Sequence, residues 1–230
     1  VTREIGEYEC LRAAKYVTQT VSNGIEVRQV NMLPKSSFNG KDLNIMMLSA
    51  SPNNWHGADR LIRGLKNYTG PVKVNLYLIG MYAPKVKKLA QQCFNQCIIF
   101  TGLLNKAEIN AIAEKVHLGV GTLALHRIPL RQGCVLKVRE YLAMGLPVIY
   151  GYEDVDLMSN ASQKYAFQVP ADESPIDIYE IIRFAATAYA DVDLRQSVRN
   201  FAINTLDISI KMKQLQDALV VHHYRGIKQF

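Results

Sequence analysis

The sequence lacks the features that mark several large classes of protein. No run of lysine or arginine exceeds two residues, and aromatic residues do not interleave with the basic ones, so the net charge of +7 is not arranged as in a nucleic-acid-binding protein. No apolar stretch approaches the roughly 18 to 20 residues that cross a bilayer, and the amino-terminal stretch is polar, unlike a signal peptide. We therefore expect no nucleic-acid partner and a cytoplasmic location, with at most a peripheral contact at the inner face of a membrane.

The sequence also lacks a specific metal site or nucleophilic motif. Its four cysteines form no paired Cys-x-x-Cys pattern; Cys93 and Cys97 could lie one helical turn apart, but two ligands do not make a zinc site, so reduced thiols are expected. Asp154 and Asp156 have a spacing that can bind a divalent cation, yet Asp191 begins the same spacing in an expected turn between helices. No Walker loop and no Ser/His/Asp set can be assembled. We expect no metal ion and no cofactor.

What the sequence does contain is a regular alternation of short apolar runs and amphipathic segments. Such alternation predicts an α/β fold, a Rossmann-like parallel sheet with helices on both faces, followed by carboxyl-terminal helices. Ligands of such sheets bind beyond the carboxyl ends of the strands. The predicted strands are Leu43 to Ser49, Val72 to Ile79, Ile98 to Phe100, Leu118 to Val120, Pro147 to Tyr150 and Ala166 to Val169. The predicted helices are His56 to Asn67, Pro84 to Phe94, Lys106 to Lys115, Val135 to Met144 and Ile176 to Ala190.

The stretch from Arg131 to Gly151 carries the strongest functional signal. A glycine-bearing turn opens a charged helix, and Gly145 and Pro147 end it because glycine accepts positive φ and proline cannot continue the helix. The free amides of the first turn and the positive end of the helix dipole favour an anion, and Lys137, one turn in, makes phosphate the natural ligand. Glu140 lies three residues further and shares that side. The amides in question belong to Gly133, Cys134 and Val135.

This stretch resembles the carboxyl-terminal domain of retaining glycosyltransferases of family 4, which have the two-domain GT-B architecture. The family signature is a glutamate, seven residues, a second glutamate, and a small-residue helix that ends in Gly-x-Pro-Val. Glu140 matches the second glutamate, and Gln132, which is uncharged, stands at the first. The resemblance implies that Glu140 binds the ribose hydroxyls of a nucleotide sugar, that Gln132 contacts the sugar, and that amides at the helix start hold the diphosphate. Those amides are the ones of Gly133, Cys134, Val135 and Leu136.

Two further loops match the same family. In Trp-His-Gly-x-Asp-Arg the position of a diphosphate-binding lysine holds His56, and an earlier arginine position holds Ser51. The resemblance implies that His56 or Arg60 assists Lys137 at the diphosphate, although Arg60 could instead pair with Asp59 or Glu140. Thr101-Gly102-Leu103-Leu104 resembles the turn that contacts the nucleobase through backbone atoms of Gly102 and Leu103.

The loop after the fourth predicted strand leads to Gln132. It brings His126, Arg127 and Arg131 to the rim where a sugar diphosphate would lie. We expect Arg127 to face water.

The resemblance also divides the chain. Residues 1–34 would be the end of the amino-terminal domain and the linker, because Val21-Ser22-Asn23-Gly24-Ile25 looks like the step before the interdomain linker of GT-B transferases. Residues 35–190 would bind the nucleotide sugar, and residues 191–230 would be helices that return toward the absent acceptor domain, with breaks near Asp191 and Asp207. Within the first part, the pattern predicts a helix over residues 4–15 and a strand over 16–21.

The function implied is transfer of a sugar from a nucleoside diphosphate to a hydroxyl acceptor with retention, in polysaccharide or glycoconjugate synthesis. The partners implied are the nucleotide sugar and the missing acceptor domain, so the chain alone should bind donor and turn over little. Two alternatives stay open. One is a non-catalytic nucleotide-binding or assembly domain, which would account for Gln132, and the other is a GT-B-like nucleotide-sugar epimerase.

Overall fold

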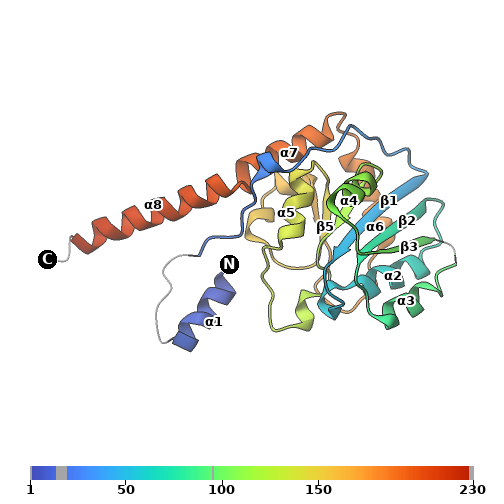
Figure 1. Ribbon diagram of the computed structural model, residues 1–230, viewed down its shortest axis with the longest axis horizontal. Coiled ribbons are helices and arrows are strands. Elements are labelled where there is room, and N and C mark those ends of the chain that lie inside the picture. The colour runs from blue at the N-terminus through green and yellow to red at the C-terminus, as the bar shows by residue number, and fades with distance from the viewer. Residues whose placement is uncertain (1, 14–19, 95, 228–230) are drawn as a thin grey trace.

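A computed structural model of the chain, which describes residues 2–13, 20–94 and 96–227, has a six-stranded parallel sheet at its centre (Figure 1). The strand order is β3-β2-β1-β4-β5-β6, so the chain reverses its direction of winding between β1 and β4. This confirms the predicted Rossmann-like α/β fold. Most of the strand predicted over 16–21 lies outside the described residues. The strands are β1 Asp42–Ser49, β2 Lys73–Gly80, β3 Cys97–Gly102, β4 Leu118–Val120, β5 Val148–Tyr150 and β6 Ala166–Gln168.

Helices cover both faces of the sheet, as predicted. Because side chains alternate along a strand, Ile45 and Met47 of β1 join the apolar cluster under α2, α3 and α6, while Met46 joins the cluster under α4, α5 and α7. All three side chains are fully buried. The helices are α1 Arg3–Ala13, α2 Ala58–Asn67, α3 Pro84–Ala90, α4 Lys106–Ala113, α5 Leu136–Ala143, α6 Ile178–Ala188, α7 Leu194–Thr205 and α8 Ile208–Ile227.

The helices predicted between residues 56 and 190 are each shorter in the structure than the sequence suggested, and in α3 the difference changes the position of a cysteine. The helix expected over 84–94 ends at Ala90, so Cys93 lies in the following turn and Cys97 opens β3. The two thiols are therefore not one helical turn apart, and that prediction was wrong. Burial raises the pKa of the Cys93 thiol, which keeps it protonated at neutral pH.

The segment before β1 packs against the carboxyl-terminal helices. Val27 and Leu33 are buried in the cluster that contains α5 and α7. The guanidinium of Arg199, on α7, donates to the carbonyls of Val27 at 3.0 Å and of Val30 at 2.8 Å. Hydrogen bonds to backbone carbonyls thus fasten residues 25–36 to the sheet domain. The predicted domain boundary at residue 34 stays a prediction.

The start of α8 is fastened by a buried group of charges. Asp154 and Asp156 lie in the loop after β5; Arg139 of α5 pairs with both carboxylates, and Lys211 of α8 donates to Asp156 at 2.6 Å. Arg139, Asp154 and Lys211 are almost fully buried. Both carboxylates of the Asp-x-Asp pattern are therefore engaged by cationic side chains of this chain.

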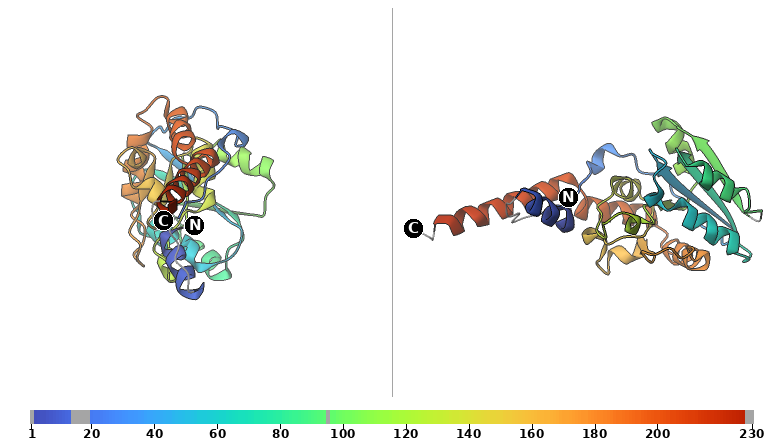
Figure 2. Two further views of the ribbon diagram at one scale, coloured as in Figure 1. Left: turned by 90° about the vertical axis from the view of Figure 1, so that its left-hand side faces the viewer. Right: turned by 90° about the horizontal axis from the view of Figure 1, so that it is seen from below.

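Beyond Lys211, α8 extends away from the sheet domain (Figures 1 and 2). The break between α7 and α8 falls at residues 206–207, which confirms the break predicted near Asp207. The projecting part of α8 exposes apolar side chains, among them Met212, Leu219 and Val220. In the part of the chain that the structure describes, no helix combines the length and apolarity needed to span a bilayer.

Candidate functional site

Side chains of α5 form hydrogen bonds with the carboxyl end of β1, where the strand order reverses between β1 and β4. β4 pairs with β1 only as far as Met47, so the next residue, Leu48, has no strand partner on that side. Instead the Leu48 N–H donates to the Tyr141 hydroxyl at 3.0 Å, and its carbonyl accepts from the Lys137 Nζ at 3.0 Å. The first turn of α5 is thereby held against the end of β1.

One glycine allows α5 to come this close to the sheet, and a second allows its end to lie against α7. A Cβ on Gly121, just after β4, would lie 2.7 Å from Val138 of α5. Gly145 ends the helix with a φ of 82°, and a Cβ there would lie 2.5 Å from the carbonyl oxygen of Arg195. These residues confirm the predicted helix end and fix where Lys137 projects.

Lys137 is the ionisable group at the centre of this end of the sheet. Burial lowers the pKa of its ammonium to about 7. Near neutral pH the side chain is therefore only partly protonated, and a neighbouring phosphate would favour the charged form. The backbone N–H groups of Leu136 and Lys137 donate to no other described residue, as at most helix starts. Together these groups can bind an anion.

His56 lies close to Lys137 in the loop between β1 and α2. Its side chain packs against the Trp55 ring, with 4.0 Å between ring centroids, and the residue is only 8% exposed. Neither ring nitrogen has a hydrogen-bond partner among the described residues. Burial and the Lys137 charge lower its pKa to about 4. The imidazole is neutral at pH 7, so it can offer one hydrogen bond but no charge where the resemblance expects lysine.

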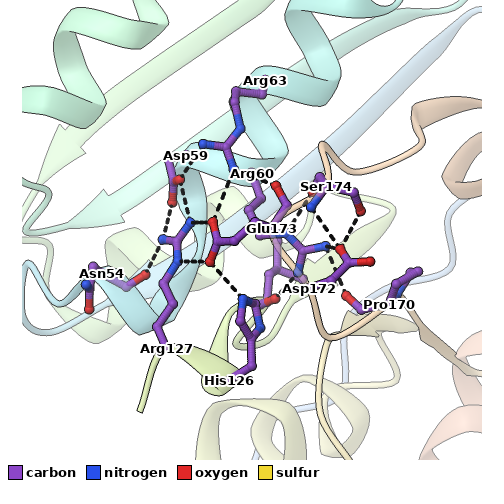
Figure 3. Close-up of polar contacts among 11 residues, drawn as sticks. Asn54, Asp59, Arg60, Arg63, His126, Arg127, Pro170, Asp172, Glu173 and Ser174 are labelled. Atoms are coloured by element: carbon purple, nitrogen blue, oxygen red, sulfur yellow. Dashed lines mark hydrogen bonds and ion pairs between the residues drawn. The ribbon is translucent and has the colours of Figure 1, made fainter.

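Arg60 points away from this end of α5. Its guanidinium is fully buried and donates to the carbonyls of Leu123 and Ser174 and to that of Pro170 at 3.0 Å (Figure 3). Its ion pair is with Asp172 at 3.1 Å, not with either of the residues expected from the sequence, Asp59 and Glu140. These contacts join α2 to the loops after β4 and β6. The donor-binding role of Arg60 stays a prediction.

Replacing Arg60 with methionine is expected to lower the free energy of unfolding by about 2 kcal/mol, because the buried carbonyl of Leu123 loses its donor. Urea denaturation measures this. Arg63→Met is the matched control, with a side chain 35% exposed and an ion pair to Asp59, and it should cost less than about 1 kcal/mol. A loss for Arg60→Met no larger than that for Arg63→Met would show that the buried hydrogen bonds of Arg60 do not stabilise the fold.

Arg127 is not the solvated side chain that the sequence suggested. It is 13% exposed and forms a paired contact with Asp59, 2.8 Å from each carboxylate oxygen, and a further contact with Glu173 at 2.6 Å (Figure 3). The Arg127 and His126 hydrogen bonds lower the pKa of Glu173 to about 2. The network joins the loops after β4 and β6 to α2, and it keeps the loop that leads to Gln132 in place.

The remaining predicted residues take different positions. Glu140 is exposed on α5, one turn beyond Lys137, and its carboxylate makes no hydrogen bond or ion pair with a described residue. Gly102 has a φ of 75° with nothing near it, and Leu103 is 72% exposed, so the turn after β3 is open. The Gln132 amide oxygen accepts from the Glu4 N–H at 3.2 Å. These groups are open or held by hydrogen bonds that a ligand can replace.

The start of α5 differs from the prediction in one respect. The Gly133 N–H donates to the Glu153 carbonyl at 2.9 Å, so it is not free to bind an anion. This amide is used because residues 131–133 pair with Glu153 beside β5. Cys134 is buried, and its carbonyl accepts from Asn23 at 3.0 Å. The open amides of Leu136 and Lys137 include one that was predicted, Leu136, and one that was not, Lys137.

The sequence pattern missed the role of Tyr141. Lys137 and Tyr141 are four residues apart and so lie on one face of the helix, and both contact Leu48. That spacing was the available signal. Their common partner lies 89 residues before Lys137 and could not be inferred from periodicity.

No family model matches the sequence, and no curated protein matches it. Solved structures do match. A glycosyltransferase from Rickettsia africae is 16% identical with a TM-score of 0.56, and the match covers 95% of this chain and 52% of that chain. A sucrose-phosphate synthase from Thermosynechococcus elongatus is 16% identical with a TM-score of 0.62, covering 95% of this chain and 57% of that one. Anabaena HepE, solved with UDP and glucose, is 16% identical with a TM-score of 0.64, covering 94% and 61%.

These identities are low enough that the matches establish the fold alone. The chain spans between about half and three-fifths of the length of the three structures. Its parallel sheet, with helices on both faces, is the Rossmann-like α/β fold that these GT-B glycosyltransferase structures share.

Proposed function

We propose that this chain binds a nucleoside diphosphate sugar at the amino-terminal end of α5, and that the whole protein is a retaining glycosyltransferase of family 4. The observation that carries the proposal is Lys137, whose Nζ donates to the Leu48 carbonyl at the carboxyl end of β1 and whose helix begins with two open amides. This is the position at which open α/β sheets bind their ligands. The UDP bound in the HepE structure supports uridine diphosphate as a first probe.

In this proposal each residue has a separate task. The α5 amides and Lys137 neutralise the diphosphate without a metal ion, neutral His56 donates one hydrogen bond, and Glu140 accepts from the ribose hydroxyls. Gln132 contacts the sugar through its amide. Leu103 and Gly102 contact the base through their backbone.

The reaction exchanges one bond for another at the anomeric carbon. The bond from that carbon to the diphosphate oxygen breaks, and the nucleoside diphosphate leaves with the electron pair. The acceptor hydroxyl forms the new carbon–oxygen bond on the same face, and its proton passes to the leaving diphosphate. Stabilising the charge on that leaving group is the main catalytic contribution of Lys137 and the α5 amides. Polysaccharide or glycoconjugate synthesis is the setting proposed.

In this proposal a domain outside the chain forms most, but not all, of the acceptor side of the site. The exposed apolar residues of α8, Met212, Leu215 and Leu219, are three and four positions apart and so share one face. We propose that this face packs against that domain. The chain alone should therefore bind donor without appreciable transfer.

A non-catalytic nucleotide-binding domain is the second candidate. The observation that favours it is Gln132, which lacks the charge of the family glutamate and is hydrogen-bonded to Glu4 rather than open. Transfer by the full-length protein separates the two functions. If Gln132→Glu raises the rate of sugar transfer, the glycosyltransferase function is supported. If neither form transfers sugar, the non-catalytic nucleotide-binding function is supported.

Replacing Glu140 with alanine is expected to weaken uridine diphosphate binding about tenfold, or about 1.4 kcal/mol, because the ribose loses a charged hydrogen-bond acceptor. Isothermal titration calorimetry measures the change. Inorganic pyrophosphate, which has no ribose, should bind the variant at least as well as the parent. Glu114→Ala, an exposed carboxylate between α4 and β4 and so at the amino-terminal ends of the strands, is the matched control. Equal loss for both ligands would remove Glu140 from the ribose site.

A further inference from the structure

A cavity lies next to Gln132, the residue that we place at the transferred sugar. It has a volume of about 640 Å³ and is lined by residues of the three loops that follow β4, β5 and β6, with Glu4 of α1 at its edge. Pockets of about 300 to 1,000 Å³ are typical of small-molecule sites. The cavity is thus large enough for a ligand of its own.

Backbone hydrogen bonds hold the walls of this cavity together. The Glu153 N–H donates to the Arg131 carbonyl at 2.9 Å, and the Gly133 N–H returns a bond of 2.9 Å to Glu153. On the other side the Glu4 carboxylate accepts from the N–H groups of Arg131 and Gln132 at 2.8 and 2.9 Å. The residues that line the cavity therefore have fixed backbone positions.

Three polar side chains of the cavity, those of Arg131, Glu153 and Gln168, have atoms open to a ligand. Arg131 and Glu153 are exposed, and neither side chain makes a hydrogen bond or an ion pair with any residue that the structure describes. Gln168 donates from its Nε2 to the Tyr152 carbonyl at 2.8 Å, which fixes the side chain and leaves its amide oxygen open. One wall is apolar and consists of Ile128 and Pro129. The cavity thus offers a donor, two acceptors and an apolar surface.

This composition selects a class of ligand. Glu4 and Glu153 repel an isolated phosphate, and Arg131 repels a cation, so a neutral ligand fits best. Each hydroxyl of a sugar ring both donates and accepts, and its C–H faces are apolar, so one ring can use the guanidinium, the carboxylate and the apolar wall together.

The location adds a second argument. Arg131 directly precedes Gln132, which we place at the transferred sugar, and Glu153 pairs with Gln132 across the backbone. We propose that this cavity binds a sugar ring of the acceptor, with Arg131, Glu153 and Gln168 holding its hydroxyls. The acceptor role rests on the proposed donor site, whereas binding of a neutral sugar ring does not.

Saturation-transfer difference NMR tests the proposal with maltose, cellobiose and lactose as probes at millimolar concentration. At least one disaccharide is expected to bind, and Glu153→Ala and Gln168→Ala should each weaken it about fivefold, the effect of losing one hydrogen bond of about 1 kcal/mol. Both side chains are exposed, so the variants should fold, which the thermal midpoint checks. Glu114→Ala is again the control, and uridine diphosphate affinity is measured in every variant.

The outcomes separate the two proposals. Disaccharide binding that the cavity variants weaken while uridine diphosphate affinity is unchanged supports the acceptor site. No saturation transfer from any disaccharide, or binding that both variants leave intact, overturns it. If disaccharides bind in the cavity but uridine diphosphate does not bind the chain, the sugar site stands and its acceptor role is overturned together with the donor proposal.

Discussion

Replacing Lys137 with methionine is expected to weaken binding of uridine diphosphate by about 10- to 150-fold, because a hydrogen bond to a charged group contributes about 1.5–3 kcal/mol. Methionine keeps the length and the apolar stem of the side chain, so α5 should stay against β1. Calorimetry at pH 6.5 measures the loss. Lys115→Met, an exposed lysine just before β4 and so at the amino-terminal ends of the strands, should change the affinity little. An affinity for Lys137→Met within twofold of the parent chain would remove Lys137 from the site.

The same residue makes binding depend on pH in a defined direction. Burial lowers the pKa of Lys137 to about 7, and a bound diphosphate is expected to raise it again. Above pH 7 the complex therefore holds a proton that the free protein has lost, so the affinity of the parent chain should fall as pH rises from 7 to 9. Lys137→Met should show no such fall. His56 cannot produce it, since its pKa is lowered to about 4.

Replacing Arg139 with methionine is expected to destabilise the chain by about 3–5 kcal/mol. Its guanidinium and the Asp154 carboxylate are both fully buried and form a paired contact, and the charge of Asp154 raises the pKa of Arg139 despite the cost of burial. Removing the cation leaves Asp154 as an uncompensated charge in the interior. Urea denaturation at pH 7 measures the change.

A double variant distinguishes the effect of leaving Asp154 unpaired from the effect of lost side-chain packing. Arg139→Met combined with Asp154→Leu should recover at least about 1 kcal/mol relative to Arg139→Met alone, because no charge is left unpaired. Asp156 keeps Lys211 as its partner in both variants. A single variant that costs less than about 1 kcal/mol would show that this buried group is not what fastens α8 and the loop after β5.

The sequence was sufficient to predict the features that depend on local patterns. The apolar period predicted a parallel sheet with helices on both faces, and the end of α5 followed from Gly145, whose positive φ is a local requirement. The break before α8 was also predicted from the local sequence, near Asp207. The end of α3 was predicted too late because the sequence signal at the end of a helix is weak.

Features that depend on distant partners could not be predicted. Arg127 was expected in water because its partners Asp59 and Glu173 lie 68 and 46 residues away. The partners of Arg60 lie up to 114 residues away, and nothing near it in the sequence indicates a buried guanidinium. The Gly133 amide was expected to be open because its partner, the Glu153 carbonyl, lies beyond β5 and is not indicated by the local sequence.

Part of the positive charge is buried inside the chain, which composition does not reveal. Arg60, Arg139 and Lys211 are almost fully buried, and their charges face carboxylates or carbonyls of the chain itself. The net charge of +7 is therefore not a measure of the field at the proposed donor site. There the relevant charge is Lys137, assisted by the dipole of α5.

The most direct measurement is a crystal structure of the chain soaked with uridine diphosphate. Our proposal predicts the diphosphate against the amides of Leu136 and Lys137, with the Lys137 Nζ turned from the Leu48 carbonyl toward a phosphate oxygen and the ribose hydroxyls on Glu140. Diphosphate bound elsewhere, for example on Arg131, or a Lys137 that stays on Leu48 with no ligand near it at saturating concentration, would contradict the proposal.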